Sequence, residues 1–566
     1  MIFRLFAALL LTVAFTTHGA TDGRTDGALA MPDRFAADAA AKVIADGGNA
    51  VDAAIAAAFS LAVTYPEAGN LGGGGFLLAF VDGEPAFLDF REVAPAAARA
   101  DMYLADDGRF RARDALVGGR ASGVPGTVRG LAAAHARYGT LPWARLLAPA
   151  IGLARDGFRV PADLAEAAAE TRTFLADDTN FAHYFGGLEA GQPFRQPELA
   201  ATLERLAADP EEFYRGRTAE LLVAQQAKSG GLITAADLAG YTPRWREPLA
   251  GRWRGYTVLT APPPSSGGVA LLQLLGLREA AAPLFAGAEH NGPRYLHLLA
   301  ELEKRVFADR ARYLADPDFV PVPVDALLDP AYLARRAAGV NAAAISPAAA
   351  VPPGLDGPHT THFSIVDRAG NAVSLTYTLN WGFGSGVVVE GAGFLLNNEM
   401  DDFSAAPGVP NEFGVIGGEA NAIAPGKRML SSMTPTILLK DGAPAIVLGT
   451  PGGSTIFTSV FQVLLNLVDA GLAPQDAVDA TRFHHQLPQA RLIRHDQWPI
   501  PDRTRLGLEQ LGYRVEANDW GHLGDVQLVT AGAAGTAAAA DRRGRGVARI
   551  LPAGNRVTPP RQDAEQ

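Results

Sequence analysis

The hydrophobic pattern of the N-terminal part predicts helices. Apolar positions recur at helical spacing over residues 34–46, and two glycines follow, which is a common helix stop. Asn49 then suits an N-cap with Asp52 at the third helical position, ahead of a nearly all-apolar helix over 50–66. A helix that is apolar on every side is expected to lie buried between layers.

Pairs of short apolar runs separated by turn residues predict strands further along the chain. Three such pairs indicate hairpins: 76–81 with 86–90, 361–366 with 371–379, and 434–439 with 445–450. Residues 120–320 are expected to be mainly helical, and 454–471 again show helical periodicity. Helices on both sides of a strand-rich middle indicate sheets covered by helices, an α+β layered sandwich.

The start of the chain has the pattern of an export signal. Residues 5–15 form a short apolar run after Arg4, and small residues follow at Gly19 and Ala20. The run is too short to span a bilayer, so we expect residues 1–20 to be a removable signal peptide. The mature protein would then be periplasmic or secreted, without a membrane span. The alternative is a buried N-terminal helix.

Composition narrows the possible functions. The 566 residues are 48% hydrophobic and 19% charged, which excludes a disordered protein. A net charge of −11 offers no basic field, so no nucleic-acid partner is expected. The absence of cysteine excludes disulfides, thiolate nucleophiles, iron–sulfur clusters and cysteine-ligated zinc. A nucleophile in this chain would therefore use oxygen.

Thr360 is the main candidate nucleophile. It stands where a stretch rich in Pro and Ala, about 343–358, meets the strand-forming sequence TTHFSIV; we expect that stretch to be an exposed linker. A hydroxyl nucleophile needs a neighbouring base, and no GxSxG motif is present. If the chain were cut before Thr360, the new α-amine, with a pKa of about 7.7–8.0, could serve as that base. The residues alone leave open that this Thr-Thr pair simply starts a strand.

Two other patterns have a chemical and a structural interpretation. Gly452 and Gly453 precede a predicted helix, so their N–H groups could approach a reacting carbonyl beside a helix N-terminus. The alternative is a plain helix-entry turn. The glycine run 72–75 lacks the GK[ST] of a phosphate loop. His484 and His485 have no evident third ligand, so we expect a structural role for them and no metal site.

Longer stretches of the chain resemble one enzyme family. They are, in order, GGNAVDAAIAAAFSLAVTYPEAGNLGGGGF, LDFREVAP, ASGVPGTVRG, LAPAIGLARDGF, ADRARYLADPDF, GPHTTHFSIVDRAGNAVSLTYTLNWGFGSG, FLLNNEMDDFS, KRMLSSMTPTI, GTPGGS and RFHHQ. Together they cover essentially the whole chain after the signal. The chain resembles the γ-glutamyltransferases, which are N-terminal-nucleophile hydrolases, and the resemblance implies a four-layer αββα sandwich.

The resemblance also implies self-cleavage between His359 and Thr360. The products would be a large chain, 21–359, and a small chain, 360–566, which stay together as a heterodimer. Thr360 would then attack a γ-glutamyl amide and pass the acyl group to water or to an amino-acid or dipeptide acceptor. Thr378 matches the threonine that supports the nucleophile, and Gly452 and Gly453 match the oxyanion hole. No cofactor is implied.

The remaining matched residues concern the donor substrate. Arg91 matches the residue that holds the donor α-carboxylate, for which a guanidinium fork is suited, and Asp402 matches the residue that pairs with the α-ammonium. Glu92 is expected to orient Arg91. The other donor contacts implied by the resemblance are Asn380, Glu399, Ser431 and Ser432.

The chain departs from the family pattern in the loop that covers the site. Residues 404–426 match this lid, and Phe413 stands where many bacterial relatives have a tyrosine whose hydroxyl reaches the donor-site asparagine. We therefore expect a looser lid over Asn380, which alters the balance between hydrolysis and transfer, with Trp381 compensating sterically. Glu399 stands where some relatives have a glutamine.

Three functional hypotheses follow. The leading one is a γ-glutamyl hydrolase and transferase acting on glutathione and similar γ-glutamyl compounds. A glutaryl or cephalosporin acylase on the same scaffold is the first alternative, but its substrate has no α-ammonium and would not need Asp402. The second alternative is an unprocessed, inactive binding protein, against which the presence of Thr360, Gly452 and Gly453 argues.

Overall fold

The computed structural model describes residues 26–175, 177–348, 351, 361–404, 418–498, 500–518, 521–533 and 535–552. The predicted signal, the cleavage site at His359 and Thr360, most of the predicted linker and the lid residue Phe413 lie outside these described residues.

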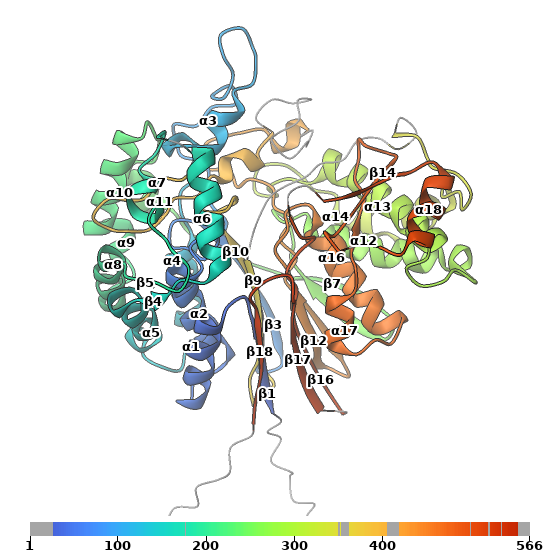
Figure 1. Ribbon diagram of the computed structural model, residues 1–566, viewed down its shortest axis with the longest axis horizontal. Helices are drawn as coiled ribbons and strands as arrows, with labels where there is room; N and C mark the ends of the chain where they lie inside the picture. Colours follow the sequence, from blue (N-terminus) through green and yellow to red (C-terminus); the bar gives the residue numbers. More distant parts are fainter. Residues whose placement is uncertain are drawn as a thin grey trace, which may run out of the picture.

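Two antiparallel sheets stack face to face at the centre of the molecule (Figure 1). The first has seven strands, in the order β18 (Val547–Leu551), β1 (Gly27–Met31), β9 (Thr361–Val366), β10 (Ala372–Thr378), β2 (Gly74–Val81), β3 (Glu84–Asp89) and β6 (Arg244–Arg246). The second has six, in the order β17 (Gly535–Ala540), β16 (Gln527–Gly532), β12 (Ala443–Gly449), β11 (Thr436–Lys440), β8 (Tyr256–Thr260) and β7 (Leu249–Trp253).

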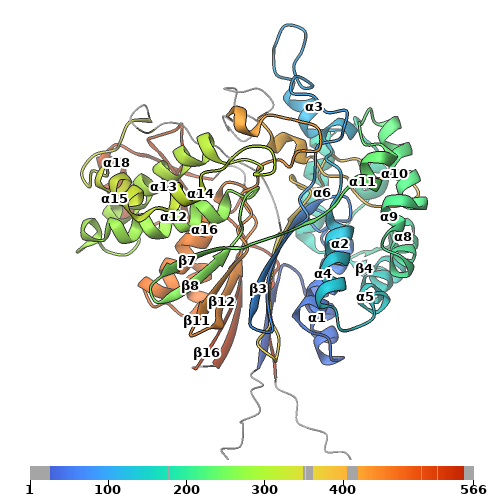
Figure 2. The same ribbon diagram turned by 180° about the vertical axis from the view of Figure 1, so that it is seen from behind.

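Helices cover the outer face of each sheet, as both views show (Figures 1 and 2). The helices beside the first sheet are α1 (Arg34–Ala45), α2 (Ala50–Thr64), α4 (Thr127–Tyr138), α5 (Trp143–Asp156), α6 (Ala162–Leu175), α7 (Phe181–Phe185), α8 (Pro197–Ala208), α9 (Glu212–Arg215), α10 (Arg217–Lys228) and α11 (Ala235–Gly240). Beside the second sheet lie α12 (Gly267–Ala280), α13 (Pro293–Tyr313), α14 (Val324–Leu328), α15 (Pro330–Ala338), α16 (Thr455–Leu464), α17 (Pro474–Asp479) and α18 (Asp502–Leu511). The layers are thus helix, sheet, sheet and helix, which confirms the predicted α+β sandwich.

Smaller elements complete the described chain. Helix α3 (Ala112–Leu116) lies at the end of the molecule that is uppermost in Figure 1. Two small sheets pair β4 (Phe158–Arg159) with β5 (Pro193–Phe194), and β13 (Phe483–His484) with β14 (Leu492–His495) and β15 (Arg514–Ala517). Among the described residues, no helix is long and apolar enough to cross a membrane.

Helix α2 shows why the predicted apolar helix forms and where it packs. The Asn49 side chain accepts from the N–H groups of Val51 and Asp52, and the Asp52 side chain accepts from the N–H of Asn49. This reciprocal capping box satisfies N–H groups that a helix start leaves unpaired. All 15 residues of α2 are buried between the first sheet and its neighbouring helices, which confirms the prediction.

The space between the sheets is also apolar, with Phe76 and Leu78 of β2 against Ile437 of β11 and Val447 of β12. The predicted hairpins are confirmed, because β2 pairs with β3, β9 with β10, and β11 with β12.

The expectation for residues 120–320 was incomplete, because this range contains β7 and β8, two strands of the second sheet. They are joined by Arg254 and Gly255, with φ values of 50° and 82°, as in a tight hairpin turn with positive φ at both central residues. The Arg-Gly pair is a weaker turn signal than Asn-Gly, and the neighbouring helical periodicity masked it. The helix predicted over 454–471 is α16, continued by a π-helical turn at Leu465–Asp469.

Candidate active site

Thr361, the residue that follows Thr360, lies beside the end of β10. Thr361 at the start of β9 pairs with Tyr377, the neighbour of Thr378. The Oγ1 atom of Thr378 accepts from the N–H of Asn380 at 2.7 Å, and its carbonyl accepts from Asn70 Nδ2 at 2.9 Å. Both the main chain and the hydroxyl of the buried Thr378 are therefore held in place.

The glycine run 72–75 is explained by close approach of the backbone at this point. A Cβ atom on Gly73 would lie 2.0 Å from the carbonyl oxygen of Thr378, so a larger residue could not let the chain pass so near. The run packs the end of β10 against the start of β2, which agrees with its exclusion as a phosphate loop.

Gly452 and Gly453 form the turn between β12 and α16. Their φ values are 131° and 59°, in the region that favours glycine. The end of β12 approaches the start of β9, because a Cβ atom on Gly449 would lie 2.4 Å from His362 Cε1. The two glycines thus follow a strand end that contacts the residue two positions after Thr360, at the N-terminus of a 10-residue helix.

Asn380 has a conformation that few residues other than glycine adopt. Its φ is 81°, which asparagine tolerates better than most residues but which still stores strain. Its Nδ2 donates to the Asn398 carbonyl at 3.0 Å, while its buried Oδ1 accepts no hydrogen bond from the described residues. A buried acceptor without a partner is costly, so this oxygen is available to a donor group on a substrate.

Arg91 is the centre of a buried charged cluster. The chain turns after β3 because Asp89 Oδ1 accepts from the Arg91 N–H at 3.0 Å. The Arg91 guanidinium, 1% exposed, lies 2.6 Å from Glu399 Oε2, 3.6 Å from Glu92 Oε2 and in contact with Asp402 Oδ2. The resemblance assigns Arg91 to the α-carboxylate and Asp402 to the α-ammonium at the amino-acid end of a donor, and the structure places the two side chains in direct contact.

A short 3₁₀ turn explains why two acidic residues face the same guanidinium. Residues Glu399–Asp402 form this turn, and residues three apart in a 3₁₀ turn lie one above the other. The first and last side chains of the turn therefore point to the same side, toward Arg91.

Three carboxyl groups around one guanidinium cannot all ionise cheaply in a buried site. Burial raises the pKa of Glu92 to about 7, although Arg91 lowers it. Burial likewise raises the pKa of Glu399 well above its usual value and raises that of Asp402, again opposed by Arg91. The cluster therefore retains a proton near neutral pH, and it can offer a guanidinium to a carboxylate and a carboxylate to an ammonium group.

Ser431 and Ser432 lie in the extended segment before β11, against the start of α12. The N–H and hydroxyl of Ser266 donate to the Ser431 carbonyl at 2.7 and 2.6 Å. Arg310 of α13 donates to the hydroxyls of Ser266 and Ser432 at 2.7 and 2.9 Å. Arg310 also opposes the rise that burial causes in the pKa of Asp402, so it belongs to the same electrostatic environment, a role that the sequence did not predict.

The structure thus brings most of the predicted site residues to one region. Arg91 contacts Glu92, Glu399 and Asp402, and Arg310, which binds Ser432, acts electrostatically on Asp402. Thr378 and Asn380 are joined to each other by a hydrogen bond. The Trp381 ring, next to Asn380, lies 5.5 Å from the ring of Phe174 on α6.

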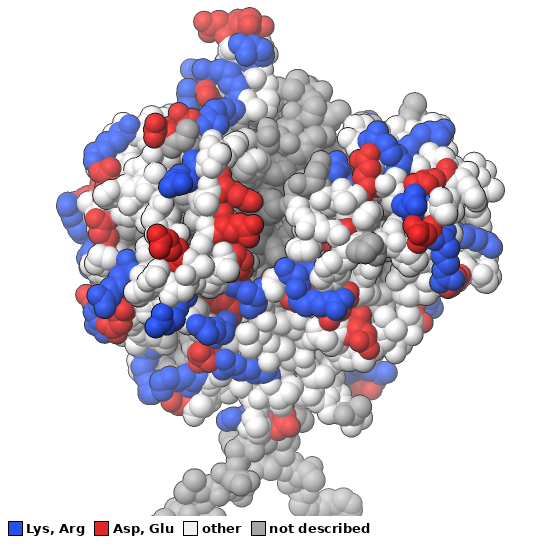
Figure 3. Space-filling model, viewed as in Figure 1, with Lys and Arg blue, Asp and Glu red and all other residues white. Residues whose placement is uncertain are grey.

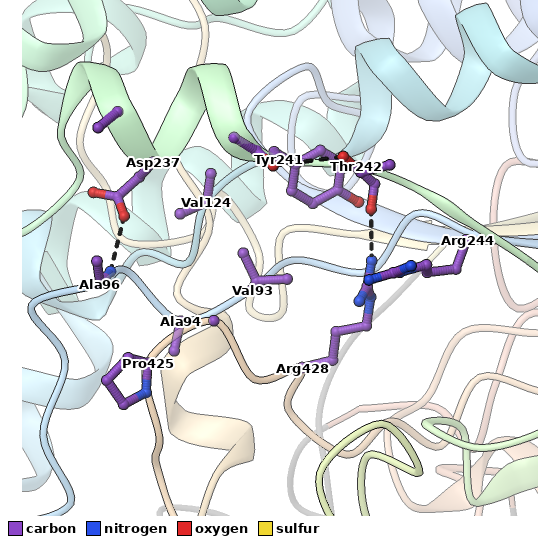
Figure 4. A pocket seen from close by; sticks show the side chains of 13 residues that line it. Val93, Ala94, Ala96, Val124, Asp237, Tyr241, Thr242, Arg244, Pro425 and Arg428 are labelled. Carbon is purple, nitrogen blue, oxygen red and sulfur yellow. Dashed lines mark hydrogen bonds between the residues drawn. The ribbon is translucent and has the colours of Figure 1, made fainter.

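A cavity of about 430 Å³ is lined in part by residues of the segment 93–96, which follows Arg91 in the chain (Figure 4). Its lining includes Val93, Tyr241 and Arg428, but none of the predicted site residues. The Tyr241 hydroxyl donates to the Arg91 carbonyl at 2.9 Å, and Arg428 donates to the Thr242 carbonyl at 2.9 Å. Tyr241 in the cavity wall therefore supports the backbone of Arg91.

The two adjacent histidines are bound to protein groups. His484 Nδ1 lies 3.0 Å from Thr458 Oγ1, and His485 Nδ1 lies 2.6 Å from the Leu492 carbonyl. Burial lowers the pKa of His484 to about 4 and that of His485 to about 3. Within the described ranges there is no group of three or more His, Cys, Asp or Glu residues suited to a metal ion.

On the face drawn in Figure 3, acidic and basic side chains are interspersed.

Comparison with known proteins identifies the family. The sequence model described as Gamma-glutamyltranspeptidase matches residues 36–551. A glutathione hydrolase proenzyme of Pseudomonas aeruginosa is 56% identical over 555 residues, which cover 97% of this chain and 99% of that protein.

Two solved structures are similar as well. A gamma-glutamyltranspeptidase from Pseudomonas nitroreducens in complex with L-DON is 54% identical, covers 57% of this chain and 97% of its own, and has a TM-score of 0.56. A cephalosporin acylase from Bacillus halodurans is 29% identical, covers 93% of this chain and 96% of its own, and has a TM-score of 0.81. With a family match over nearly its whole length, this chain belongs to the gamma-glutamyltranspeptidase family.

Proposed function

We propose that this chain is a self-processing γ-glutamyltransferase and glutathione hydrolase. The observation that carries the proposal is the pairing of Arg91 with Asp402 and Glu399 in one buried cluster, which suits the zwitterionic end of a γ-glutamyl donor. The high identity to a glutathione hydrolase proenzyme supports the same substrate class. Thr360 is the proposed nucleophile on the strength of the family resemblance.

Maturation is proposed at Thr360, which directly precedes β9 in the sequence. Its hydroxyl attacks the His359 carbonyl, the peptide C–N bond breaks, and an ester forms while the amine of Thr360 takes up a proton. Water then opens the ester, leaving a carboxylate on His359 and a free α-amine on Thr360. The proposed products are a large chain, 21–359, and a small chain, 360–566, held together as one heterodimer by sheets that contain strands from both.

Catalysis uses the same hydroxyl with its own α-amine as base. The amine takes the hydroxyl proton as the oxygen attacks the γ-carbonyl, and the resulting oxyanion is stabilised by the N–H groups of Gly452 and Gly453. The tetrahedral intermediate collapses, the proton goes to the leaving amine, and a γ-glutamyl ester remains on Thr360. Water or an acceptor amine then repeats the attack and restores the hydroxyl. Thr378, whose hydroxyl is already fixed by Asn380, is proposed to orient the nucleophile.

Donor recognition requires an exchange of partners in the charged cluster. The donor α-carboxylate binds Arg91, Ser431 and Ser432, while its ammonium binds Asp402, Glu399 and the Oδ1 of Asn380, which has no partner among the described residues. Glutathione and related γ-glutamyl compounds are the proposed donors, and amino acids or dipeptides the proposed acceptors besides water. A periplasmic or secreted location is proposed from the predicted signal.

The competing function is a glutaryl or cephalosporin acylase, a possibility raised by the structural similarity to a cephalosporin acylase. The test compares hydrolysis of a γ-glutamyl anilide with that of the glutaryl analogue, which differs only in lacking the α-amino group. We expect a much higher kcat/KM for the γ-glutamyl compound. Faster cleavage of the glutaryl compound would refute the proposed substrate class.

A further inference from the structure

A second buried charged cluster lies behind the turn that carries Gly452 and Gly453. β12 and β16 are neighbouring strands, with Gly449 opposite Gln527. The turn after β12, residues 450–454, and the segment before β16, residues 523–526, therefore leave the second sheet at the same end.

Three contacts join this turn and the following helix α16 to the neighbouring segment. The Asp525 N–H donates to Thr450 Oγ1 at 2.7 Å, and Ser459 of α16 donates to the Leu523 carbonyl at 3.1 Å. A Cβ atom on Gly452 would lie 3.3 Å from the Cα atom of Gly524. The position of the glycine turn therefore depends on where residues 523–526 lie.

Arg482 binds the main chain of that segment. Its guanidinium donates to the carbonyls of Leu523 and Gly524 at 2.6 and 3.2 Å and pairs with Asp541. The Arg482 side chain is 0% exposed. Charge-assisted hydrogen bonds from a rigid guanidinium fork fix geometry more strictly than neutral bonds do.

Two carboxylates bind the N–H groups of the same segment. Asp496 Oδ1 accepts from Leu523 at 3.1 Å, and Asp541 Oδ2 accepts from Val526 at 2.9 Å. Arg543 links these two carboxylates at 2.6 and 3.0 Å, and all these side chains are 0% exposed. The cluster of Arg482, Asp496, Asp541 and Arg543, here called the tetrad, thus balances two positive and two negative charges.

A neighbouring carboxyl group, that of Asp525, adds no further negative charge to the tetrad. Burial, and secondarily the charge of Asp541, raise the pKa of Asp525 to about 8, so this group is neutral at pH 7. A fully buried ionic cluster is a poor way to gain stability, because desolvation offsets the attraction between its charges. It is a good way to hold a backbone segment in one position.

We propose that the tetrad is a positioning network for the oxyanion turn, with Arg482 as its central residue. Oxyanion donors must lie at hydrogen-bond distance from the developing charge, and a displacement of about 1 Å can cost about 100-fold in rate. The inference rests on the proposed function, since it assigns a role within that active site. The tetrad acts through residues 523–526 on Gly452 and Gly453, as a set of positioning residues.

The test uses the mature two-chain enzyme and two sets of variants. Arg482→Lys keeps the charge but loses the two-carbonyl fork, and we expect kcat to fall about 10- to 100-fold with an unchanged KM for a γ-glutamyl anilide. Thr450→Val removes the hydroxyl that accepts from the Asp525 N–H and donates to the Pro451 carbonyl at 2.8 Å, and should lower kcat at least about fivefold, the rate equivalent of one hydrogen bond. Thr450→Ser keeps the hydroxyl and should have a kcat close to that of the wild type.

A matched control separates positioning from general loss of stability. Arg305→Lys alters another buried ion pair, 3.0 Å from Glu301, away from the glycine turn, and should leave kcat unchanged. If Arg482→Lys does not fold, the Thr450 pair still decides, because Thr450→Val removes only one hydroxyl and its hydrogen bonds to Asp525 and Pro451. Unchanged kcat in Arg482→Lys or Thr450→Val, with an active wild type, would overturn this inference alone; an inactive wild type would overturn the proposed function as well.

Discussion

Replacement of Asp402 by Asn is the most informative change in the donor site. Asn has the same shape and keeps an oxygen for Arg91, but it removes the charge that is proposed to bind the donor ammonium. Arg91 keeps its ion pair with Glu399 at 2.6 Å, so the guanidinium is not left unpaired in the buried site. The substitution therefore isolates one electrostatic contact.

The expected size of the effect follows from that contact. A hydrogen bond to a charged group contributes about 1.5–3 kcal/mol, and about 1.4 kcal/mol corresponds to a tenfold change in rate. We expect kcat/KM for a γ-glutamyl anilide to fall about 10- to 150-fold in Asp402→Asn. The glutaryl anilide has no ammonium, so its kcat/KM should change by less than about threefold, or about 0.6 kcal/mol.

The same substitution should change the pH dependence. Asp402 must be ionised to bind an ammonium group, and burial raises its pKa above the ordinary value of 3.8, with Arg91 opposing the shift. In the wild type, kcat/KM for the γ-glutamyl anilide should therefore decline on acidification at a pH above 3.8. In Asp402→Asn, the part of this decline in kcat/KM that is due to protonation of Asp402 should be absent.

The assay measures release of the aniline from both compounds across pH, with Asp318→Asn as control. Asp318 also pairs with an arginine, Arg246 at 2.8 Å, but it lies outside the charged cluster, so neither substrate should be affected. Equal losses on the γ-glutamyl and glutaryl compounds would show that Asp402 only supports the fold. That result would refute the assignment of Asp402 to the donor ammonium.

Three further predictions concern the nucleophile support, the fold and its pH dependence. Thr378→Val removes the acceptor of the Asn380 N–H and should lower kcat about tenfold, whereas Thr378→Ser should retain most of the wild-type kcat. Equal kcat values for the two variants would exclude this support role. Asn49→Ala removes the cap of α2 and should lower the free energy of unfolding in urea by about 1 kcal/mol without changing KM; an unchanged midpoint would contradict the capping argument. The pKa of Asp525 is raised from 3.8 to about 8 in the folded state, so the contribution of this group to stability should be greatest below about pH 4 and be lost as pH rises to about 8. Asp525→Asn should flatten that decline in thermal unfolding midpoints, and an unaltered pH profile would contradict it.

The sequence predicted those parts of the fold that depend on neighbouring residues. The capping box of Asn49 and Asp52 and the three hairpins could be predicted because cap, turn and period are local signals. The β7–β8 hairpin was missed because Arg254 and Gly255 are a weak turn pair within a helical region. The pairing of β1 with β18, the first and last strands of the large sheet, could not be predicted, since no local pattern encodes a partner at the far end of the chain.

The candidate site likewise includes residues that the sequence could identify and contacts that it could not. The family resemblance identified Arg91, Asp402 and the glycine pair, because these residues lie in recognisable stretches. The direct contact between Arg91 and Asp402, and the roles of Arg310 and Arg482, depend on packing between segments far apart in the sequence. A buried arginine on a helix such as α13 looks like a surface charge until the layers that cover it are known.

The central claim is that Thr360 cleaves its own chain and then serves as the nucleophile. The most direct test is the mass of the purified protein, with N-terminal sequencing of the smaller product, for the wild type and for Thr360→Ala. The wild type should give two chains, the smaller beginning at Thr360, and Thr360→Ala should give one uncut, inactive chain. An intact wild-type chain, or cleavage of Thr360→Ala at the same bond, would contradict the account.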